Sequence, residues 1–254
     1  MNKKHLLELK NVSVSFSPGI YAIKNVSVSI KPCAITSVIG ASGAGKSTLL
    51  RSINRMHELY PNIKLSGEIS LDGKNIMEMK PIEVRRRIGM VFQMPNPFPA
   101  MNIYQNVLSG YKLNKIYLSK AEKDEIVEKS LQDVALWDEV KNSLNKSALS
   151  LTVGQQQRLC IARTLALQPE FLLMDDPTSS IDPICTNRIE ELMYRLKDNH
   201  TIIVVAHNLS QASRISDYAM YLEKGELVEY DISNVMFVAP KDKRTERYIT
   251  EQIE

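Results

Sequence analysis

The segment Gly40–Thr48 has the residue types and the spacing needed to bind the phosphates of a nucleotide. It fits the pattern G-x-x-x-x-G-K-[ST] at every position. Glycines let successive backbone N–H groups turn inward on phosphate oxygens without a side-chain clash. Lys46 supplies positive charge for the β- and γ-phosphates, and the Ser47 hydroxyl is a ligand for Mg²⁺. The candidate nucleotide-binding residues are Gly40, Ala41, Ser42, Gly43, Ala44, Gly45, Lys46, Ser47 and Thr48.

Two acidic residues and a histidine directly follow apolar segments that predict buried strands. Phe171–Met174 leads into Asp175 and Asp176, and Thr201–Ala206 leads into His207. In a parallel sheet the carboxyl ends of the strands face the ligand crevice. We therefore expect Asp175 to hold Mg²⁺, Asp176 to polarise an attacking water, and His207 to lie at the same edge.

The elements that must position these residues are those of a parallel sheet with crossover helices. Ala34–Ile39 predicts a buried strand before the phosphate-binding segment, and Ser47–Met56 predicts a helix after it. Such a helix points its positive N-terminal end at the bound anion. Alternation of apolar and polar residues over Leu7–Phe16 and Val26–Ile30 predicts half-buried antiparallel strands.

The middle of the chain has a different pattern. A further pair of strands is expected at Gly67–Leu71 and Ile88–Phe92, and the proline-rich Pro95–Pro99 breaks regular structure. Lys120–Val140 has the apolar spacing of a helix. We predict one α/β domain over residues 1–254: a P-loop NTPase (RecA-like) parallel-sheet core, an N-terminal antiparallel β region, and a helical subdomain inserted at 95–165.

Composition excludes several classes of protein. The chain has 254 residues, of which 44% are hydrophobic and 24% charged, which is ordinary for a globular protein. A net charge of +3 does not build the positive field that binds nucleic acid. No apolar run approaches the roughly 20 residues of a membrane span. The N-terminus lacks the features of a signal peptide, and three widely separated cysteines fit a reducing cytoplasm.

The phosphate-binding motif occurs in several classes of protein and does not by itself settle the function. A GTPase would need Asn-Lys-x-Asp, and the nearest string, Asn145–Ala148, lacks the aspartate. The segment Leu151–Arg158 precedes the acidic strand. Together with Gln93, Ser180–Asp182 and His207, it resembles the ATP-binding subunit of ABC transporters over the whole chain.

Strings outside the phosphate-binding segment narrow the resemblance to the phosphate-importer branch of that family. They are Met90–Pro99, Leu159–Arg163, Pro177–Pro183, His207–Leu209, Ser216–Tyr218 and Pro240–Thr250. The resemblance implies an ATPase subunit of an importer for inorganic phosphate, with ATP and Mg²⁺ as cofactors. It also implies a homodimer bound to two transmembrane permease subunits at the cytoplasmic face of the membrane, served indirectly by a phosphate-binding protein outside.

The resemblance further implies roles for individual residues. Two copies close head to tail, so that each ATP lies between the phosphate-binding loop of one copy and the signature segment of the other. The implied signature residues are Thr152, Val153, Gly154 and Gln155. The implied catalytic residues are Asp176, His207 and Gln93, the implied Mg²⁺ ligands are Ser47, Gln93 and Asp175, and the implied link between the subunits is Asp182.

The sequence departs from the family pattern at two of these positions. Val153 stands where the family has glycine, so the backbone is strained if that position needs a positive φ and keeps its N–H contact if it does not. We expect a weaker ATP sandwich. Asp176 replaces the usual glutamate and sets its carboxylate back by about 1.5 Å. We therefore expect slow hydrolysis with ATP binding retained, since a misplacement near 1 Å can cost about 100-fold in rate.

Three questions stay open at the level of sequence. The aromatic residue that stacks on adenine is Phe16 or Tyr21, although the family position falls on Ser17. The cargo could be another small solute, because the ATPase never touches it. A second alternative is a regulatory subunit that binds ATP and seldom hydrolyses it. A third is a soluble ABC ATPase that acts in DNA repair or translation. The last usually has two cassettes or long insertions, unlike this chain.

Overall fold

Two β-sheets organise the computed structural model, which describes residues 5–179 and 181–253. The larger sheet has the strand order β10-β9-β3-β8-β7-β6. Strands β6, β7, β8, β3 and β9 run parallel, and β10 pairs with β9 in the antiparallel sense. Their bounds are β3 Ile35–Ile39, β6 Ile88–Val91, β7 Phe171–Asp175, β8 Thr201–Val205, β9 Tyr218–Glu223 and β10 Glu226–Ile232.

The smaller sheet is antiparallel and has the order β2-β1-β4-β5. Its strands are β1 Leu7–Ser17, β2 Ile20–Ile30, β4 Lys64–Leu71 and β5 Lys74–Asn75. The expected pairing of the segments at Gly67–Leu71 and Ile88–Phe92 is wrong. The first lies in β4, which pairs with β1, and the second forms β6, which pairs with β7 in the other sheet.

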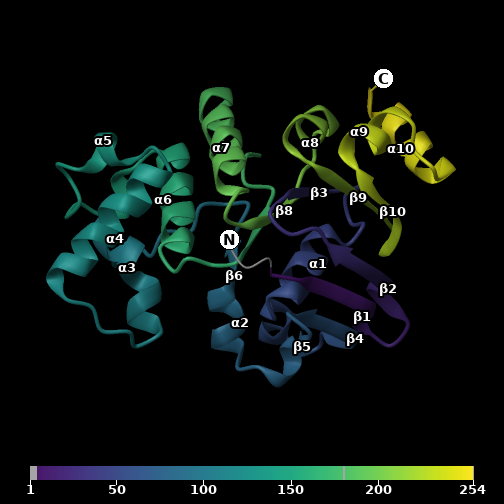
Figure 1. The fold of residues 1–254 in the computed structure, drawn as a ribbon, viewed down its shortest axis with the longest axis horizontal. Helices are drawn as coiled ribbons and strands as arrows, with labels where there is room; N and C mark the ends of the chain where they lie inside the picture. Colours follow the sequence, from purple (N-terminus) through teal and green to yellow (C-terminus); the bar gives the residue numbers. More distant parts are fainter. Residues whose placement is uncertain (1–4, 180, 254) are drawn as a thin grey trace.

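Ten α-helices connect and cover these sheets within the described residues. They are α1 Lys46–Ile53, α2 Pro81–Arg87, α3 Ile103–Leu113, α4 Lys120–Asp133, α5 Trp137–Val140, α6 Val153–Leu165, α7 Pro183–Leu196, α8 Leu209–Ile215, α9 Ser233–Val238 and α10 Lys243–Ile253. Short 3-10 turns occupy Met56–Leu59, Ile76–Glu78 and Ala148–Ser150. Helices α3 to α6, here called the helical lobe, lie together at one end, and the antiparallel sheet lies at the other (Figure 1).

Two of the expected helices differ from those in the structure. The helix expected over Ser47–Met56 ends at Ile53, because Arg55 takes a left-handed backbone with φ 60° and begins the 3-10 turn. The helix expected over Lys120–Val140 is interrupted at Ala135, which has φ 50°. Both breaks lie at positive φ, which a helix cannot accommodate.

The core lies on both faces of the parallel sheet. Phe171 and Leu173 of β7 pack with the antiparallel sheet and α1, whereas Leu172 and Met174 face α7 and the helical lobe. Alternate residues of a strand point to opposite faces, so a strand covered on both faces is apolar throughout. This explains the continuous apolar runs in the sequence. None of the described helices combines the length and the apolar character needed to cross a membrane.

Candidate active site

The phosphate loop, residues Gly40–Thr48, joins the end of β3 to the start of α1. Gly40 has φ 147°, and a Cβ atom there would lie 2.2 Å from the carbonyl oxygen of Leu222. Gly45 has φ 100°, and its Cβ would lie 2.3 Å from the carbonyl oxygen of Ala22. Glycine is therefore required at both ends of the loop, for its backbone conformation and for space.

Lys46 holds its ammonium group inside this loop. The side chain is buried, and Nζ donates hydrogen bonds to the carbonyl oxygens of Gly40 at 2.7 Å and Ala41 at 2.9 Å. Burial lowers the pKa of Lys46, while the carboxylates of Asp176 and Asp175 oppose that shift. The loop thus contains one cation surrounded by backbone groups, an arrangement suited to a polyphosphate.

Ser47 and Asp175 bring two oxygen ligands together beside the loop. The Ser47 hydroxyl donates to Oδ1 of Asp175 at 2.6 Å, and Arg51 Nη2 lies 3.4 Å from Oδ2 of the same carboxylate. Asp175 is the last residue of β7 and is buried. A hydroxyl and a carboxylate are the hard oxygen donors that Mg²⁺ takes together with phosphate oxygens. The donor set fits this ion.

Asp176 lies next to two of the other expected catalytic residues. Gln93 Nε2 donates to Oδ2 of Asp176 at 3.2 Å, and His207 Nε2 lies 3.5 Å from the same oxygen. Asp176 is buried and has φ 50°, a left-handed conformation that aspartate tolerates better than most residues. Burial raises the pKa of Asp176, and His207 opposes the rise. The carboxyl group is therefore a better proton acceptor than an exposed one when ionised.

Gln157 connects the segments that carry Gln93 and Asp176; it belongs to the segment Leu151–Arg158, but the sequence assigned it no role of its own. It lies in α6 and is buried, and its Nε2 donates to the carbonyl oxygens of Phe92 at 2.9 Å and Pro177 at 3.1 Å. These carbonyls adjoin Gln93 and Asp176 in the chain. Gln157 thus holds α6 against both segments.

The signature residues form the start of α6, away from the phosphate loop of the same chain. Thr152 is the N-cap, and its Oγ1 accepts the N–H of Gln155, whose Oε1 accepts the N–H of Thr152 in return. Val153 is the first residue of the helix, does not adopt a positive φ, and has 49% of its surface exposed. The alternative of a strained backbone at Val153 is therefore wrong.

Gly154 packs against the segment that follows Asp175 and Asp176. A Cβ atom on Gly154 would lie 2.6 Å from Sγ of Cys185, so glycine is needed for the contact. Asp182 caps α7, with Oδ1 accepting the N–H of Cys185 at 3.0 Å, and its side chain is exposed. Ser180, which belongs to the same motif, lies outside the described residues. Asp182 is thus joined to the signature of its own chain through Cys185.

Glu139 of the helical lobe is the centre of a hydrogen-bonded cluster around α6, the signature helix, which begins with the signature residues. Its carboxylate accepts from Gln155 Nε2 at 2.8 Å, from Arg158 Nη2 at 2.9 Å, and from Arg188 Nη1 at 2.9 Å. Burial alone would raise the pKa of Glu139, but these partners lower it overall. No sequence pattern indicated Glu139, because its partners lie on two other helices.

The two adenine candidates are both exposed. Phe16 at the end of β1 has 45% of its surface exposed, and Tyr21 at the start of β2 has 48%. Phe16 is therefore not an ordinary core residue, and it lines a cavity that Thr48 of the phosphate loop also lines. Tyr21 does not line that cavity.

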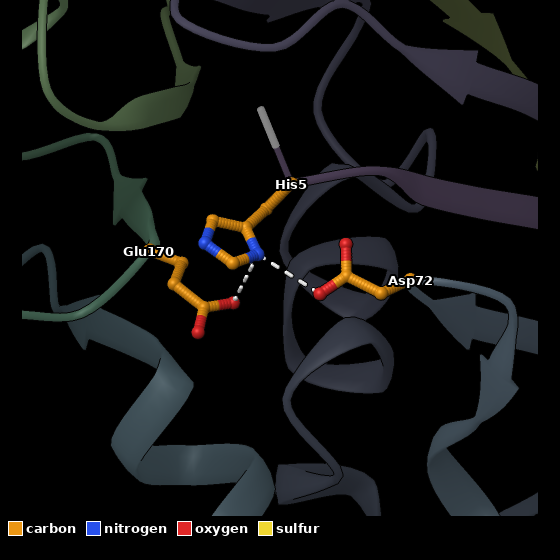
Figure 2. Close-up of side chains that lie close together, drawn as sticks. All are labelled: His5, Asp72 and Glu170. Carbon is orange, nitrogen blue, oxygen red and sulfur yellow. Dashed lines mark hydrogen bonds and ion pairs between the residues drawn. The ribbon is translucent and has the colours of Figure 1, made fainter. Parts of the chain in front are cut away.

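A second cluster of titratable groups lies at the opposite end of β7. His5 Nδ1 is 2.9 Å from Oδ2 of Asp72 and 3.3 Å from Oε2 of Glu170 (Figure 2). Glu170 immediately precedes β7, whereas Asp175 ends the strand and Asp176 follows it. Arg87 Nη2 lies 2.5 Å from both carboxylates. Because a guanidinium already occupies the position between the acids, this cluster is an ion-pair clamp between the two sheets.

Comparison with known proteins shows the family and the fold of the chain. A sequence model of the ABC transporter family matches residues 23–179. The chain belongs to this family, so the predicted family and fold class are confirmed.

Among curated relatives, the chain is 47% identical over 251 residues to the phosphate import ATP-binding protein PstB of Tropheryma whipplei (strain Twist), covering 96% of this chain and 97% of that protein. It is 51% identical over 237 residues to the protein of the same name from Rubrobacter xylanophilus, and the match covers 90% of this chain and 82% of that protein.

Two solved structures resemble the whole fold. A dimer of the ATP-binding cassette MJ0796 in a post-hydrolysis state, bound to ADP and Pi, matches with a TM-score of 0.76 and 31% identity, covering 89% of this chain and 98% of that chain. The structure of cbiO1 from Clostridium perfringens, part of an ABC transporter complex, matches with a TM-score of 0.80 and 25% identity. The match covers 99% of this chain and 98% of that chain.

Proposed function

We propose that the chain is the ATP-hydrolysing subunit of an ABC importer for inorganic phosphate. One observation supports ATP hydrolysis. Gln93, Asp176 and His207 lie together beside the Ser47–Asp175 pair and the phosphate loop. The phosphate cargo is supported by the names of the relatives, which match over almost the whole chain.

In this proposal the loop holds the phosphates of ATP through its backbone N–H groups and the Lys46 ammonium. Ser47, Gln93 and Asp175 would hold Mg²⁺, which supplies charge neutralisation at the phosphates when bound. Asp176 accepts a proton from the attacking water. His207 and Gln93, which both contact Asp176, orient that water relative to the γ-phosphate.

The second half of each ATP site would come from a second copy of the chain. The N-terminus of α6 offers the N–H groups of Val153 and Gly154 and the positive end of a helix dipole to the γ-phosphate of the partner's ATP. The Thr152 hydroxyl already caps its own helix, so this contact depends on backbone donors. Asp182, exposed at the start of α7, would link the two subunits.

We assign permease docking to the inserted helical subdomain, residues 95–165. A cavity of about 260 Å³ lies where that subdomain meets the core, lined among others by Met90, Phe92, Phe98 and Leu113. Arg163 of α6 fixes the proline-rich segment there, because Nη2 donates to Oδ1 of Asn96 at 2.6 Å. Gln93 lies between Phe92 and this segment, so docking at the cavity would be coupled to the nucleotide site. The two permeases would hold the chain at the cytoplasmic face of the membrane.

The test is steady-state ATP hydrolysis by the purified chain, with Lys46→Ala as the blank and Asp176→Glu as the comparison. Extending the carboxylate by one carbon–carbon bond, about 1.5 Å, brings it to the reach of a glutamate and raises kcat by about 10- to 100-fold. Activity equal to the blank in both proteins, with ATP still bound, would instead assign the chain as a regulatory ATP-binding subunit.

The cargo needs a separate measurement. Uptake of labelled phosphate by vesicles that contain this chain and its co-expressed permease subunits should depend on ATP inside the vesicle and be lost in Lys46→Ala. Uptake of another solute, with no phosphate uptake, would assign the chain to an importer for that solute.

A further inference from the structure

Gln211, in the first turn of α8, is hydrogen-bonded to two segments from elsewhere in the chain. Its side-chain Nε2 donates to Oγ1 of Thr178 at 3.0 Å and to Oε1 of Glu190, a residue of α7, at 2.9 Å. Its backbone N–H donates to Oδ1 of Asn208, the N-cap of α8, at 3.0 Å. This one residue therefore joins α8 to α7 and to the segment between β7 and α7.

The Thr178 side of this contact lies next to the backbone that carries Asp176. Thr178 is buried, two residues after Asp176. The next residue, Ser179, donates to the carbonyl oxygen of Asp176 at 3.3 Å and accepts from Gln93 Nε2 at 3.2 Å. Asp176 has a left-handed backbone, which persists only where the surrounding structure determines it. Gln211 contributes to that surrounding structure through Thr178.

The position of His207 depends on the start of α8. Its side chain is 49% exposed, so packing does not hold it in one place. His207 directly precedes Asn208, and its Nε2 lies 3.5 Å from Oδ2 of Asp176. Because Gln211 is bonded to Asn208 through its backbone and to Thr178 through its side chain, it spans the two segments whose ends meet at this contact.

Glu190 anchors the amide of Gln211. The Glu190 side chain is only 7% exposed, and its carboxylate also accepts from Arg214, one turn further along α8, with Nη2 at 2.8 Å and Nε at 3.0 Å. A buried carboxylate is stable only while it is paired, so its contacts with α8 are costly to break. The first turn of α8 is thereby held against α7 as well as against Thr178.

We propose that Gln211 is a positioning residue for ATP hydrolysis, which fixes His207 relative to Asp176 by clamping the first turn of α8 to Thr178 and Glu190. It acts through these residues and not on the nucleotide itself. The inference rests on the proposed function and adds to it a residue outside the motifs that the sequence singled out.

The first test measures kcat and KM for ATP in the full chain with Gln211→Ala. We expect kcat to fall by about 10- to 100-fold, because a misplacement near 1 Å can cost that much, and KM to stay within about two-fold of the parent, because the phosphate loop is unchanged. The matched control is Ser210→Ala, which removes an exposed hydroxyl one residue earlier and should leave both constants unchanged. A parent-like kcat in Gln211→Ala would overturn the proposal, as would a loss that lies only in KM.

Exchanging the two hydrogen-bonding groups tests the contact itself. Gln211→Glu alone sets a second carboxylate against Glu190 and should lower kcat, as Gln211→Ala does. Adding Glu190→Gln to the same chain restores one amide and one carboxylate beside Arg214, so most of the lost kcat should return. Failure of the double variant to recover kcat contradicts the assignment.

Hydrogen exchange without nucleotide keeps this inference separate from the hydrolytic function. Gln211→Ala should speed exchange of the amides of Thr178, Ser179 and His207, and the double variant should return it to the parent rate. If the parent hydrolyses ATP no faster than Lys46→Ala, the hydrolytic function is refuted, and the exchange rates still decide whether Gln211 holds the two segments together. Parent-like exchange in Gln211→Ala would overturn the inference in either case.

Discussion

The ion-pair clamp at the start of β7 gives a stability prediction whose size follows from the structure. Burial alone would raise the pKa of Asp72, but hydrogen bonds from His5, from the N–H of Leu6 and from Arg87 lower it from its ordinary value of 3.8 to about 2. At about 1.36 kcal/mol for each pH unit, this difference corresponds to about 2 kcal/mol. Asp72 is exposed, so solvent screening reduces the expected contribution to about 1–2 kcal/mol.

The replacement Asp72→Asn removes this charge and keeps the local backbone. Asp72 has φ 54°, which asparagine adopts readily, and the amide oxygen can still accept the N–H of Leu6. A depressed pKa in the folded state stabilises the protein at every pH above 3.8, the value in the unfolded chain. That contribution is lost as the pH falls through about 2.

The assay is urea denaturation of the parent and Asp72→Asn between pH 7 and pH 3. We expect the variant to be less stable by about 1–2 kcal/mol at pH 5–7 and by about half as much at pH 3. Asp138→Asn is the matched control, because Asp138 forms an ion pair with Lys141 at an exposed site. A cost for Asp72→Asn that stays constant over this pH range would refute the assignment of the stabilisation to its charge.

Two further predictions concern the signature helix. Gly154→Ala should cost about 1–3 kcal/mol of stability, because the new Cβ meets Cys185 Sγ, and Cys185→Ala in the same chain should recover most of it. Calorimetric unfolding of the single and double variants measures both effects. If Cys185→Ala does not recover stability in the Gly154→Ala chain, the contact with Cys185 is not the cause of the loss. Val153→Gly should strengthen nucleotide-dependent dimerisation, since it removes an exposed side chain from the helix N-terminus. Light scattering with ATP measures this, and equal dimerisation of parent and variant argues against a role for the side chain.

The main features of the site could be predicted from the sequence because they depend on short segments. A glycine-rich loop after a buried strand, and acids at the end of another, meet at one edge of any parallel sheet. The phosphate loop, the Ser47–Asp175 pair and the neighbours of Asp176 follow from this rule. The helix ends were less predictable, since Arg55 and Ala135 take positive φ without being glycine.

The remaining features depend on contacts between distant parts of the chain, which local patterns do not encode. The partner of β4 is β1, more than forty residues earlier, and alternation of apolar residues does not say which sheet a strand joins. Glu139 similarly receives its partners from α6 and α7. The left-handed backbone of Asp176 could not be predicted from the sequence either, because most aspartate residues have a negative φ.

The contact between Gly154 and Cys185 joins the two halves of the proposed mechanism within one chain. The signature would bind the partner's ATP, while Asp176 would act on the ATP of its own chain, and the chain passes from Asp176 through Asp182 to Cys185 in nine residues. The α6 N-terminus packs directly against the start of α7, so we expect a displacement of α6 to act on α7 through this contact. We expect the hydrogen bonds of Gln157 to pass the same displacement to the segments of Gln93 and Asp176. Binding at one ATP site would thus adjust the catalytic carboxylate at the other.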